Sequence, residues 1–147
     1  MGNSQKITMV HGSGGSATRK LIQDLFHKYF QNDALDKMED AAVLDISSEK
    51  IAYTTDSFVV TPIFFQGGDI GKLAVCGTLN DLLVMGAEPK YLSAGFILEE
   101  GMDIRDLEEI IKSMALTAEE SGVKIVAGDT KVIEGSGGIY INTSGIG

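Results

Sequence analysis

The segment DIGKLAVCGTLNDLLVMG, residues 69–86, carries the pattern from which the fold of this chain can be worked out. It predicts a helix that ends at Gly86 and is closed off by Pro89, because glycine tolerates the left-handed turn after a helix and proline cannot extend it. Apolar residues lie on almost every side of this helix, so we expect it to be buried on several sides. Its main polar exceptions are Asn80 and Asp81, and a carboxylate in such a place needs a cation or hydrogen-bond donors.

Helices and strands alternate around this segment, which predicts an α/β fold. The strand signals are runs rich in β-branched and aromatic residues, and the helix signals are apolar residues at helical spacing. We expect Ser16 to cap the first helix and Asp103 to cap the last one, with Gly122 at its end. The expected helices span residues 16–30, 69–85 and 103–121, and the expected strands span residues 42–46, 51–60, 91–98, 123–127 and 138–146.

The composition describes one acidic domain without a disulfide. With 147 residues, the chain is long enough for one domain with its own core. Its net charge of −9 argues against a nucleic-acid partner, because phosphate contacts need a basic surface. The single cysteine, Cys76, excludes an internal disulfide and fits a reducing compartment. No secretory leader is visible and no apolar run approaches the ~18 residues that span a bilayer, so we expect a cytoplasmic protein without a membrane segment.

Four aspartates stand where apolar runs break into loops or turns: Asp40, Asp56, Asp81 and Asp129. Several such carboxylates, brought together, predict a site for a hard metal ion and through it for phosphate. Asp81 has an alternative role as a buried carboxylate satisfied by the backbone donors of a neighbouring turn. Asp56 interrupts a predicted strand, which favours a bulge or a site there. Asp40, taken alone, is better explained as a turn residue before a strand.

Asp129 also follows directly after a predicted buried strand, with Thr130 and Lys131 behind it. In α/β proteins, charged residues just past the end of a buried strand are a recurrent place for chemistry. The ammonium group of Lys131 is suited to contact phosphate or a charge on a substrate. An ordinary surface lysine explains the same residue equally well.

A glycine-rich segment, His11-Gly12-Ser13-Gly14-Gly15-Ser16-Ala17-Thr18, precedes the first predicted helix. Glycines let backbone N–H groups approach an anion, and the basic residues Arg19 and Lys20 behind the segment favour this function. A flexible N-terminal arm is the alternative, since the pattern is neither a Walker A loop nor a dinucleotide fingerprint. We expect His27 to be a surface residue of the first helix and Cys76 to be a core thiol.

Six short motifs follow one another in an order and spacing that resembles the N-terminal domain of the aminoimidazole ribonucleotide synthetase superfamily. They are Asp40-Ala41-Ala42, Thr54-Thr55-Asp56-Ser57, Gly67-Gly68-Asp69-Ile70-Gly71, Leu79-Asn80-Asp81-Leu82, Met85-Gly86-Ala87-Glu88-Pro89 and Gly128-Asp129-Thr130-Lys131. The resemblance runs from about Val10 to Gly147. Within the superfamily, the segment His11–Gly15, the pair Phe64-Phe65 and the triplet Cys76-Gly77-Thr78 are most similar to the carbamoyl dehydratases of hydrogenase maturation.

For the structure, the resemblance implies a mixed sheet flanked by helices, which joins the sheet of a second subunit in a dimeric barrel. Residues 1–15 would form an arm that covers the phosphates of ATP, and residues 16–147 would form the ATP-binding domain. Mg²⁺ would be held by Asp40, Asp56, Asp81 and Asp129. The nucleotide site would comprise Gly12, Ser13, Gly14, Gly15, Asp56, Asn80, Asp81, Asp129 and Thr130. The resemblance makes Lys131 and His11 the candidates for polarising the acceptor or contacting phosphate.

For the activity, the resemblance implies an ATP-dependent lyase of hydrogenase maturation. It dehydrates a carboxamide on the thiol of a C-terminal cysteine to a thiocyanate, which supplies the cyanide ligands of the nickel–iron site. Its partners would be a second copy of the chain, a carbamoyltransferase and an iron-carrying scaffold protein. Family members continue through a second domain to that cysteine, so we expect this chain to be an N-terminal fragment that is inactive alone.

Two other functions stay open at this point. One is a different ATP-dependent synthetase or kinase of the same superfamily, of the selenophosphate or thiamine monophosphate type. The other is a non-catalytic module that dimerises and docks maturation partners.

Overall fold

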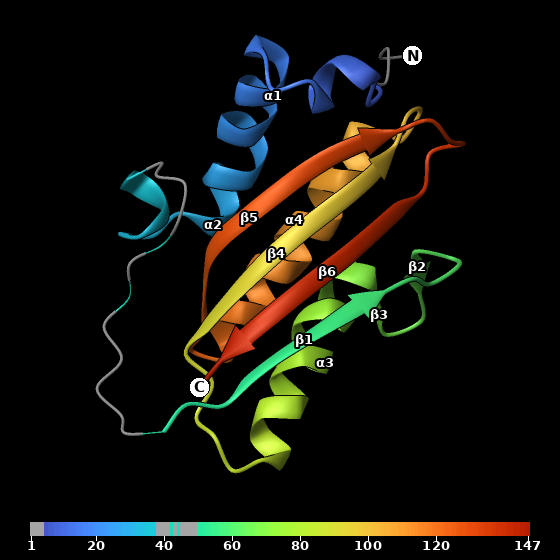
Figure 1. The fold of residues 1–147 in the computed structure, drawn as a ribbon. Coiled ribbons are helices and arrows are strands. Elements are labelled where there is room, and N and C mark those ends of the chain that lie inside the picture. Colours follow the sequence, from blue (N-terminus) through green and yellow to red (C-terminus); the bar gives the residue numbers. More distant parts are fainter. Residues whose placement is uncertain (1–4, 38–41, 43, 45–49) are drawn as a thin grey trace.

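A mixed sheet of four strands forms the centre of the chain, with helices packed on one of its faces (Figure 1). The computed structural model describes residues 5–37, 42, 44 and 50–147. The strands of the sheet are β1 (Tyr53–Phe58), β4 (Tyr91–Glu99), β5 (Lys124–Ile133) and β6 (Ile139–Ile146). Their order is β1-β6-β4-β5. β4 and β5 are parallel, and β6 is antiparallel to both β4 and β1.

The other elements surround this sheet. α3 (Ile70–Val84) and α4 (Ile104–Glu120) lie behind it in Figure 1, and β2 (Phe64–Phe65) pairs with β3 (Gly68–Asp69) in a separate ribbon. The N-terminal part contains η1 (Met9–Gly12), α1 (Ser16–Leu21), η2 (Ile22–His27), α2 (Lys28–Phe30) and η3 (Leu35–Lys37). This arrangement confirms the predicted α/β fold with a mixed sheet flanked by helices. The expected strand at 42–46 lies mostly outside the described residues, and Asp40 lies wholly outside them.

The sheet is covered on one face because its strands alternate between apolar and smaller or polar residues. On β4, Leu92, Ala94, Phe96 and Leu98 are buried against the helices. The intervening residues point to the opposite face, which no described part of the chain covers. On that face Tyr53, Ile97 and Ile133 remain exposed by 64%, 45% and 42%. The chain therefore has one closed and one open sheet face.

Helix α3 is buried on only one side, so the expectation of burial on several sides is wrong. Ile70, Ala74 and Leu82 are buried, whereas Leu83, Val84 and Met85 are exposed by 54%, 80% and 77%. The reason is that α3 packs against β1, β6 and α4 but has no second layer over it in the described structure. The predicted ends are confirmed, since Asp69 accepts hydrogen bonds from the first-turn amides and Gly86 has a φ of 77°.

The first helix departs from the prediction at its start and in its middle. Gly15, and not Ser16, is the residue before its first turn, and no side chain caps it. Its middle turn, Ile22–His27, widens into a π-helix, a feature that is rare and frequent at functional sites. α4 agrees better, because the Asp103 carboxylate accepts from the Arg105 amide and Gly122 has a φ of 68°.

Two further findings concern the ends of the elements. β5 extends to Ile133, well beyond the predicted 123–127, because its parallel pairing with β4 continues through the polar residues. Asp129 therefore lies inside a strand and not after it. At the N-terminus, the fully buried Ile7 exchanges backbone hydrogen bonds with Gly101 and Met102. Among the described helices, none has both the length and the apolar character needed to cross a bilayer.

Candidate functional site

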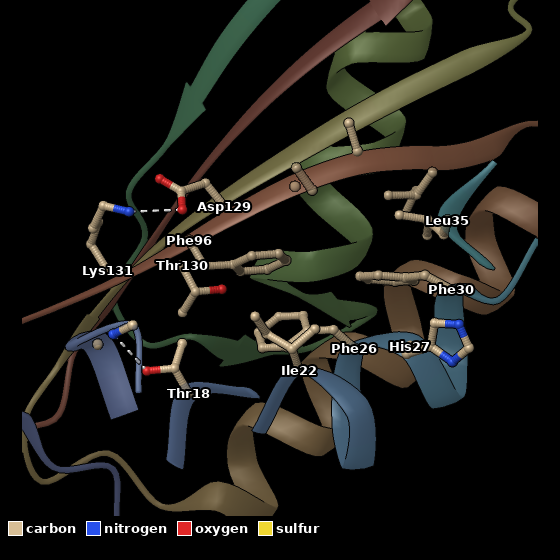
Figure 2. Close-up of a pocket in the computed structure, with 16 residues that line it drawn as sticks. Thr18, Ile22, Phe26, His27, Phe30, Leu35, Phe96, Asp129, Thr130 and Lys131 are labelled. Carbon is tan, nitrogen blue, oxygen red and sulfur yellow. Dashed lines mark hydrogen bonds and ion pairs between the residues drawn. The ribbon is translucent and has the colours of Figure 1, made fainter. Parts of the chain in front are cut away.

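A cavity of about 240 Å³ separates the N-terminal helical turns from the edge strand β5 (Figure 2). One half of its lining is apolar and consists of Ile22, Phe26, Phe30, Leu35, Phe96 and Ile125. The other half is polar or glycine-rich and includes Gly12, Gly14, Thr18, Asp129, Thr130 and Lys131. A largely apolar pocket with a few polar groups at one end is the usual form of a small-molecule site.

The glycine-rich segment lies against β5 and borders the polar end of the cavity. Gly12 packs so closely that an added Cβ atom would lie 2.7 Å from the backbone nitrogen of Val132. The amide of Gly14, which has a φ of 80°, donates to the Thr18 hydroxyl at 3.0 Å. Gly12 and Gly14 line the cavity, whereas Ser13 and Gly15 are not among its lining residues. The segment is thus ordered by contacts that only glycine permits at Gly12.

His11 lies in the same segment but outside the cavity lining. Its Nδ1 accepts a hydrogen bond from the Thr8 amide at 3.1 Å and lies 3.0 Å from the Thr8 hydroxyl. Since Nδ1 is the acceptor, the neutral ring carries its proton on Nε2. His11 therefore holds the η1 turn through one nitrogen and keeps a donor on the other.

Asp129 and Lys131 form an ion pair at the mouth of the cavity. Lys131 Nζ donates to Asp129 Oδ1 at 2.8 Å, and this hydrogen bond is the main reason why the pKa of Asp129 is lowered. Both side chains are largely exposed, so the pair adds little to folding stability. Thr130 between them is buried. β5 is the edge strand, so all three residues border the cavity although alternate side chains point to opposite faces.

Asp56 and Asp81 lie at the other edge of the sheet, between β1 and α3. The Thr54 hydroxyl donates to Asp81 Oδ2 at 3.0 Å, and Asp56 Oδ1 accepts from the Ser57 amide. Asp56 Oδ2 lies 3.7 Å from the place where a Cβ on Gly77 of α3 would be. Asp81 is exposed, as is Asn80, so the alternative of a buried carboxylate satisfied by turn amides is wrong.

The three described aspartates, Asp56, Asp81 and Asp129, are not all brought together within one chain. Asp56 is in register with Thr143 of β6. Asp129 is in register with Gly95 of β4, and Gly95 is in register with Asn142 of β6. Asn142 and Thr143 are neighbours on β6, so their side chains point to opposite faces of the sheet. Asp56 and Asp129 therefore point to opposite faces, and three strand spacings put them about 14 Å apart or more. Among the described residues, no cluster of three or more His, Cys, Asp or Glu side chains is suited to hold a metal ion.

Several residues of the cavity were not identified from the sequence. His27 was expected at the surface, but it lines the cavity, and its Nε2 lies 3.0 Å from Asp36 Oδ1. The rings of Phe26 and Phe96, with centroids 4.9 Å apart, are part of the apolar lining. The four-residue spacing of Phe26 and Phe30 was a visible signal of one helix face, whereas nothing local connects them to Phe96. Cys76 is only partly buried and lies outside this cavity.

Comparison with known proteins supports the resemblance seen in the sequence. The family described as AIR synthase related protein, N-terminal domain, matches residues 38–147. The carbamoyl dehydratase HypE of Azotobacter vinelandii is 51% identical over 143 residues, which cover 96% of this chain and 42% of the relative. This chain thus spans less than half the length of that relative.

Solved structures agree with the same assignment. The crystal structure of the hydrogenase maturation protein HypE in complex with ATP superposes with a TM-score of 0.91 and 53% identity, covering 95% of this chain and 42% of that one. A HypE–HypF complex matches with a TM-score of 0.65 and 58% identity, covering 86% of this chain and 41% of that one. By the family match and this fold, the chain belongs to the AIR synthase related proteins, with which it shares their N-terminal domain.

Proposed function

We propose that the chain is the nucleotide-binding part of an ATP-dependent carbamoyl dehydratase that serves the maturation of nickel–iron hydrogenases. The observation that carries this proposal is the cavity beside β5, where the glycine-rich segment and Lys131 border one end and an apolar wall forms the other. That division suits a ligand with phosphates at one end and an apolar ring at the other. The similarity to a HypE protein solved with ATP supports the same ligand.

The proposed reaction joins ATP to a carboxamide on a cysteine sulfur. The carboxamide oxygen attacks the γ-phosphorus of ATP, ADP leaves, and the phosphorylated oxygen is then eliminated as phosphate with loss of two protons from nitrogen. The product is a thiocyanate on the same sulfur. Catalysis of such a transfer depends mainly on positioning and on charge stabilisation at the phosphoryl group. The cysteine that carries the carboxamide would belong to the longer, full-length protein.

Lys131 and the glycine-rich segment would bind the phosphates. The Lys131 ammonium needs only to exchange one oxygen of Asp129 for a phosphate oxygen, and the exposed pair costs little to open. Gly12 and Gly14 and the hydroxyls of Thr18 and Thr130 supply neutral polar groups near the same end. His11 would add a donor through Nε2, since Nδ1 is already held by Thr8.

Mg²⁺ is part of the proposal because the chain carries a net charge of −9, which repels a free nucleotide. The carboxylates of the half-buried Asp56 and of the exposed Asp81 and Asp129 are suitable oxygen ligands, with Asp40 as a further candidate outside the described residues. When bound, the ion would neutralise charge on the phosphates. Asp129 and the pair Asp56 and Asp81 lie on opposite edges and faces of one sheet, so a single chain offers only part of a ligand set.

A homodimer would complete the site. The open sheet face carries the exposed side chains of Tyr53, Ile97 and Ile133, which a second sheet would cover. If the two sheets close into a barrel, β1 of one subunit can approach β5 of its partner, which brings Asp56 and Asp81 toward the partner's Asp129. The segment of residues 1–15 would then cover phosphates at a site shared between subunits.

Mixing two inactive variants of the full-length protein tests the shared site. ATP turnover with a carbamoylated tail is measured for Asp81→Asn, for Asp129→Asn and for a refolded mixture of both. A shared site predicts that each variant alone is nearly inactive. The mixture should recover about a quarter of wild-type turnover, because half the dimers are mixed and each mixed dimer has one intact site of two.

Two outcomes would count against this proposal. No recovery in the mixture would mean that both aspartates act within one chain. Unchanged turnover in either single variant would remove that aspartate from the metal site. A wild-type protein that neither turns over ATP nor is stabilised by Mg²⁺–ATP would instead support a non-catalytic docking module.

The remaining partners and the location follow from the same proposal. A protein similar to this chain has been solved as a HypE–HypF complex, and we propose a carbamoyltransferase of that kind as the donor of the carbamoyl group. An iron-carrying scaffold protein would accept the cyanide. Assembly of reduced metal centres fits a cytoplasmic location.

A further inference from the structure

One side chain outside the cavity holds the backbone of three residues that line it. Asn32 lies between the end of α2 and the start of η3, and its amide group makes four hydrogen bonds. Nδ2 donates to the carbonyl oxygen of Phe30 at 2.9 Å and to that of Ile125 at 2.8 Å. Oδ1 accepts from the amides of Ala34 at 3.0 Å and Leu35 at 3.2 Å. Phe30, Leu35 and Ile125 line the cavity, whereas Asn32 is not among its lining residues.

The four contacts of Asn32 use the full capacity of its amide group. That capacity is two donors on nitrogen and two lone pairs on oxygen, and the partners are two carbonyl oxygens and two backbone amides. The two bonds to the oxygen form a local turn of a kind that aspartate also makes. The two bonds from the nitrogen have no equivalent in aspartate, since an ionised carboxylate only accepts. The link to Phe30 and Ile125 therefore depends on the nitrogen.

The bond from Asn32 to Ile125 connects the N-terminal helical turns to β5 at the apolar end of the cavity. Among the hydrogen bonds of the described residues, it is the one that joins residues 16–37 to β5. At the polar end the contact is different, because there Gly12 packs against Val132. Ile125 and Val132 are seven residues apart on β5, which is about 23 Å at about 3.3 Å per residue. The cavity thus lies between two contacts with one strand.

The apolar end of the cavity is formed by segments that are distant from one another in the sequence. Figure 2 shows Phe30 and Leu35 at the end of the cavity away from Lys131. The separation of these two residues from β5 sets the width of that end. Without the nitrogen of Asn32, the width could vary although every lining side chain is still present. A cavity that is open to its ligand in only a fraction of the molecules binds more weakly by that fraction.

We propose that Asn32 is a positioning residue of the nucleotide site, which fixes the N-terminal helical turns to β5 and so keeps the apolar end of the cavity ready for its ligand. This inference rests on the proposed function, which places an apolar ring at that end. It adds a residue that lies outside the cavity lining and that none of the sequence motifs contains. Asn32 acts on the affinity for ATP and not on phosphoryl transfer, which the proposed function places near Lys131.

The variant Asn32→Asp, which has the same shape, separates the link to β5 from the local turn. It keeps an accepting oxygen for Ala34 and Leu35, and it places a second oxygen against two carbonyl groups that it cannot bond. In the full-length protein with a carbamoylated tail, the KM for ATP should rise about 10-fold while kcat stays within about twofold, as expected if about one molecule in ten holds the cavity open. The dissociation constant of inorganic tripolyphosphate, which needs only the polar end, should not change.

Two further variants accompany this one. Gln31→Glu makes the same change from amide to carboxylate at the neighbouring residue, which is exposed and outside the cavity lining, and should match the wild type for both ligands. Asn32→Ala removes all four hydrogen bonds without adding a charge, and should raise the KM for ATP at least as much as Asn32→Asp does. Urea denaturation shows whether each variant is folded. If Asn32→Asp does not fold, Asn32→Ala decides between the outcomes.

A purely structural role of Asn32 predicts a different result. Partial unfolding lowers the fraction of active protein, so kcat would fall while the KM for ATP stays at the wild-type value, and this pattern would overturn the inference. An unchanged KM and kcat, or equal losses of affinity for ATP and tripolyphosphate, would overturn it as well. In each of these cases the nucleotide function stands. A wild-type protein that binds neither ligand would instead overturn the proposed function itself.

Discussion

The two edges of the sheet differ in how their charged side chains are partnered. At the β5 edge, Asp129 and Lys131 pair with each other beside a formed cavity. At the β1 edge, the partners of Asp81 and Asp56 among the described residues are a hydroxyl and an amide. The exposed apolar end of α3 follows directly after Asp81. The charged groups at the β5 edge are thus paired and lie beside a cavity, whereas the β1 edge has charges and apolar surface that the described chain leaves uncovered. This difference is the one that the proposed shared site requires, in which each chain would supply two half-sites.

The largest expected effect is at the β5 edge. In the full-length protein, Lys131→Ala should lower kcat by about 10²-fold, the usual loss when one charge-stabilising donor is removed from a transition state. The folding stability should hardly change, because the side chain is 63% exposed. Lys124→Ala, at the other end of the same strand, is the control. If Lys131→Ala keeps wild-type turnover, Lys131 has no role in the reaction.

A pair of glycines compares the two edges by the same substitution. In Gly77→Ala the new Cβ would lie 2.8 Å from the Phe58 ring, so overpacking of about 1–3 kcal/mol outweighs a gain of about 1 kcal/mol in helix propensity. We expect a net loss of about 1 kcal/mol in the free energy of unfolding. Gly12→Ala should instead push the glycine-rich segment away from Val132 and weaken ATP binding, with little effect on unfolding.

Urea denaturation and ATP titration of both variants check this comparison. The two readouts should separate, with stability lost in Gly77→Ala and affinity lost in Gly12→Ala. If Gly12→Ala destabilises the fold as much as Gly77→Ala, then the N-terminal segment is part of the structural core and not a ligand-binding loop.

The sequence was sufficient where the pattern is local. The apolar stripe of α4, its cap at Asp103 and the stops at Gly86 and Gly122 are set by neighbouring residues, and the structure confirms them. The aromatic and aliphatic content of residues 91–98 likewise predicts a strand, and β4 runs from Tyr91 to Glu99. Where partners distant in sequence decide, the prediction was incomplete. The predicted strand 123–127 is shorter than β5, because the polar half of β5 is a strand only through its pairing with β4.

The candidate site shows the same division. The sequence predicts the glycine-rich segment, Lys131 and the aspartates as candidate site residues. It does not predict which of them lie close together in the structure. Two of the aspartates lie together and a third lies across the sheet, because strand order places β1 and β5 at opposite edges. The apolar wall and the contact of His27 with Asp36 arise from packing between segments that carry no motif. The π-helical turn also has no signal in composition or periodicity.

A smaller effect is expected from the hydrogen bond that orients Asp81. Thr54→Val removes the donor to Asp81 Oδ2 while keeping the branched shape of the side chain. The bond is exposed, so the free energy of unfolding should fall by about 0.5 kcal/mol at most. If Asp81 holds Mg²⁺, the affinity for the metal should fall more clearly than the stability. Thr55→Val, on the opposite face of the same strand, is the matched control, and an equal loss of metal affinity there would contradict a specific role for Thr54.

The smallest effect concerns the pH dependence of the β5 edge. The hydrogen bond from Lys131 lowers the pKa of Asp129 below the ordinary value of 3.8, so the folded state binds this proton less readily than the unfolded state does. The stability from the pair is therefore present above pH 3.8 and is lost as the pH falls through the lower, folded-state pKa. Asp129→Asn should make the acid side of the stability curve slightly less steep, while Asp24→Asn, on the exposed surface of η2, serves as the comparison. Since the pair is exposed, 0.5 M salt should abolish most of the difference between Asp129→Asn and the wild type. If the difference persists in salt, the Asp129 carboxylate is less accessible to solvent than its exposure in one chain indicates. This result would contradict an exposed ion pair.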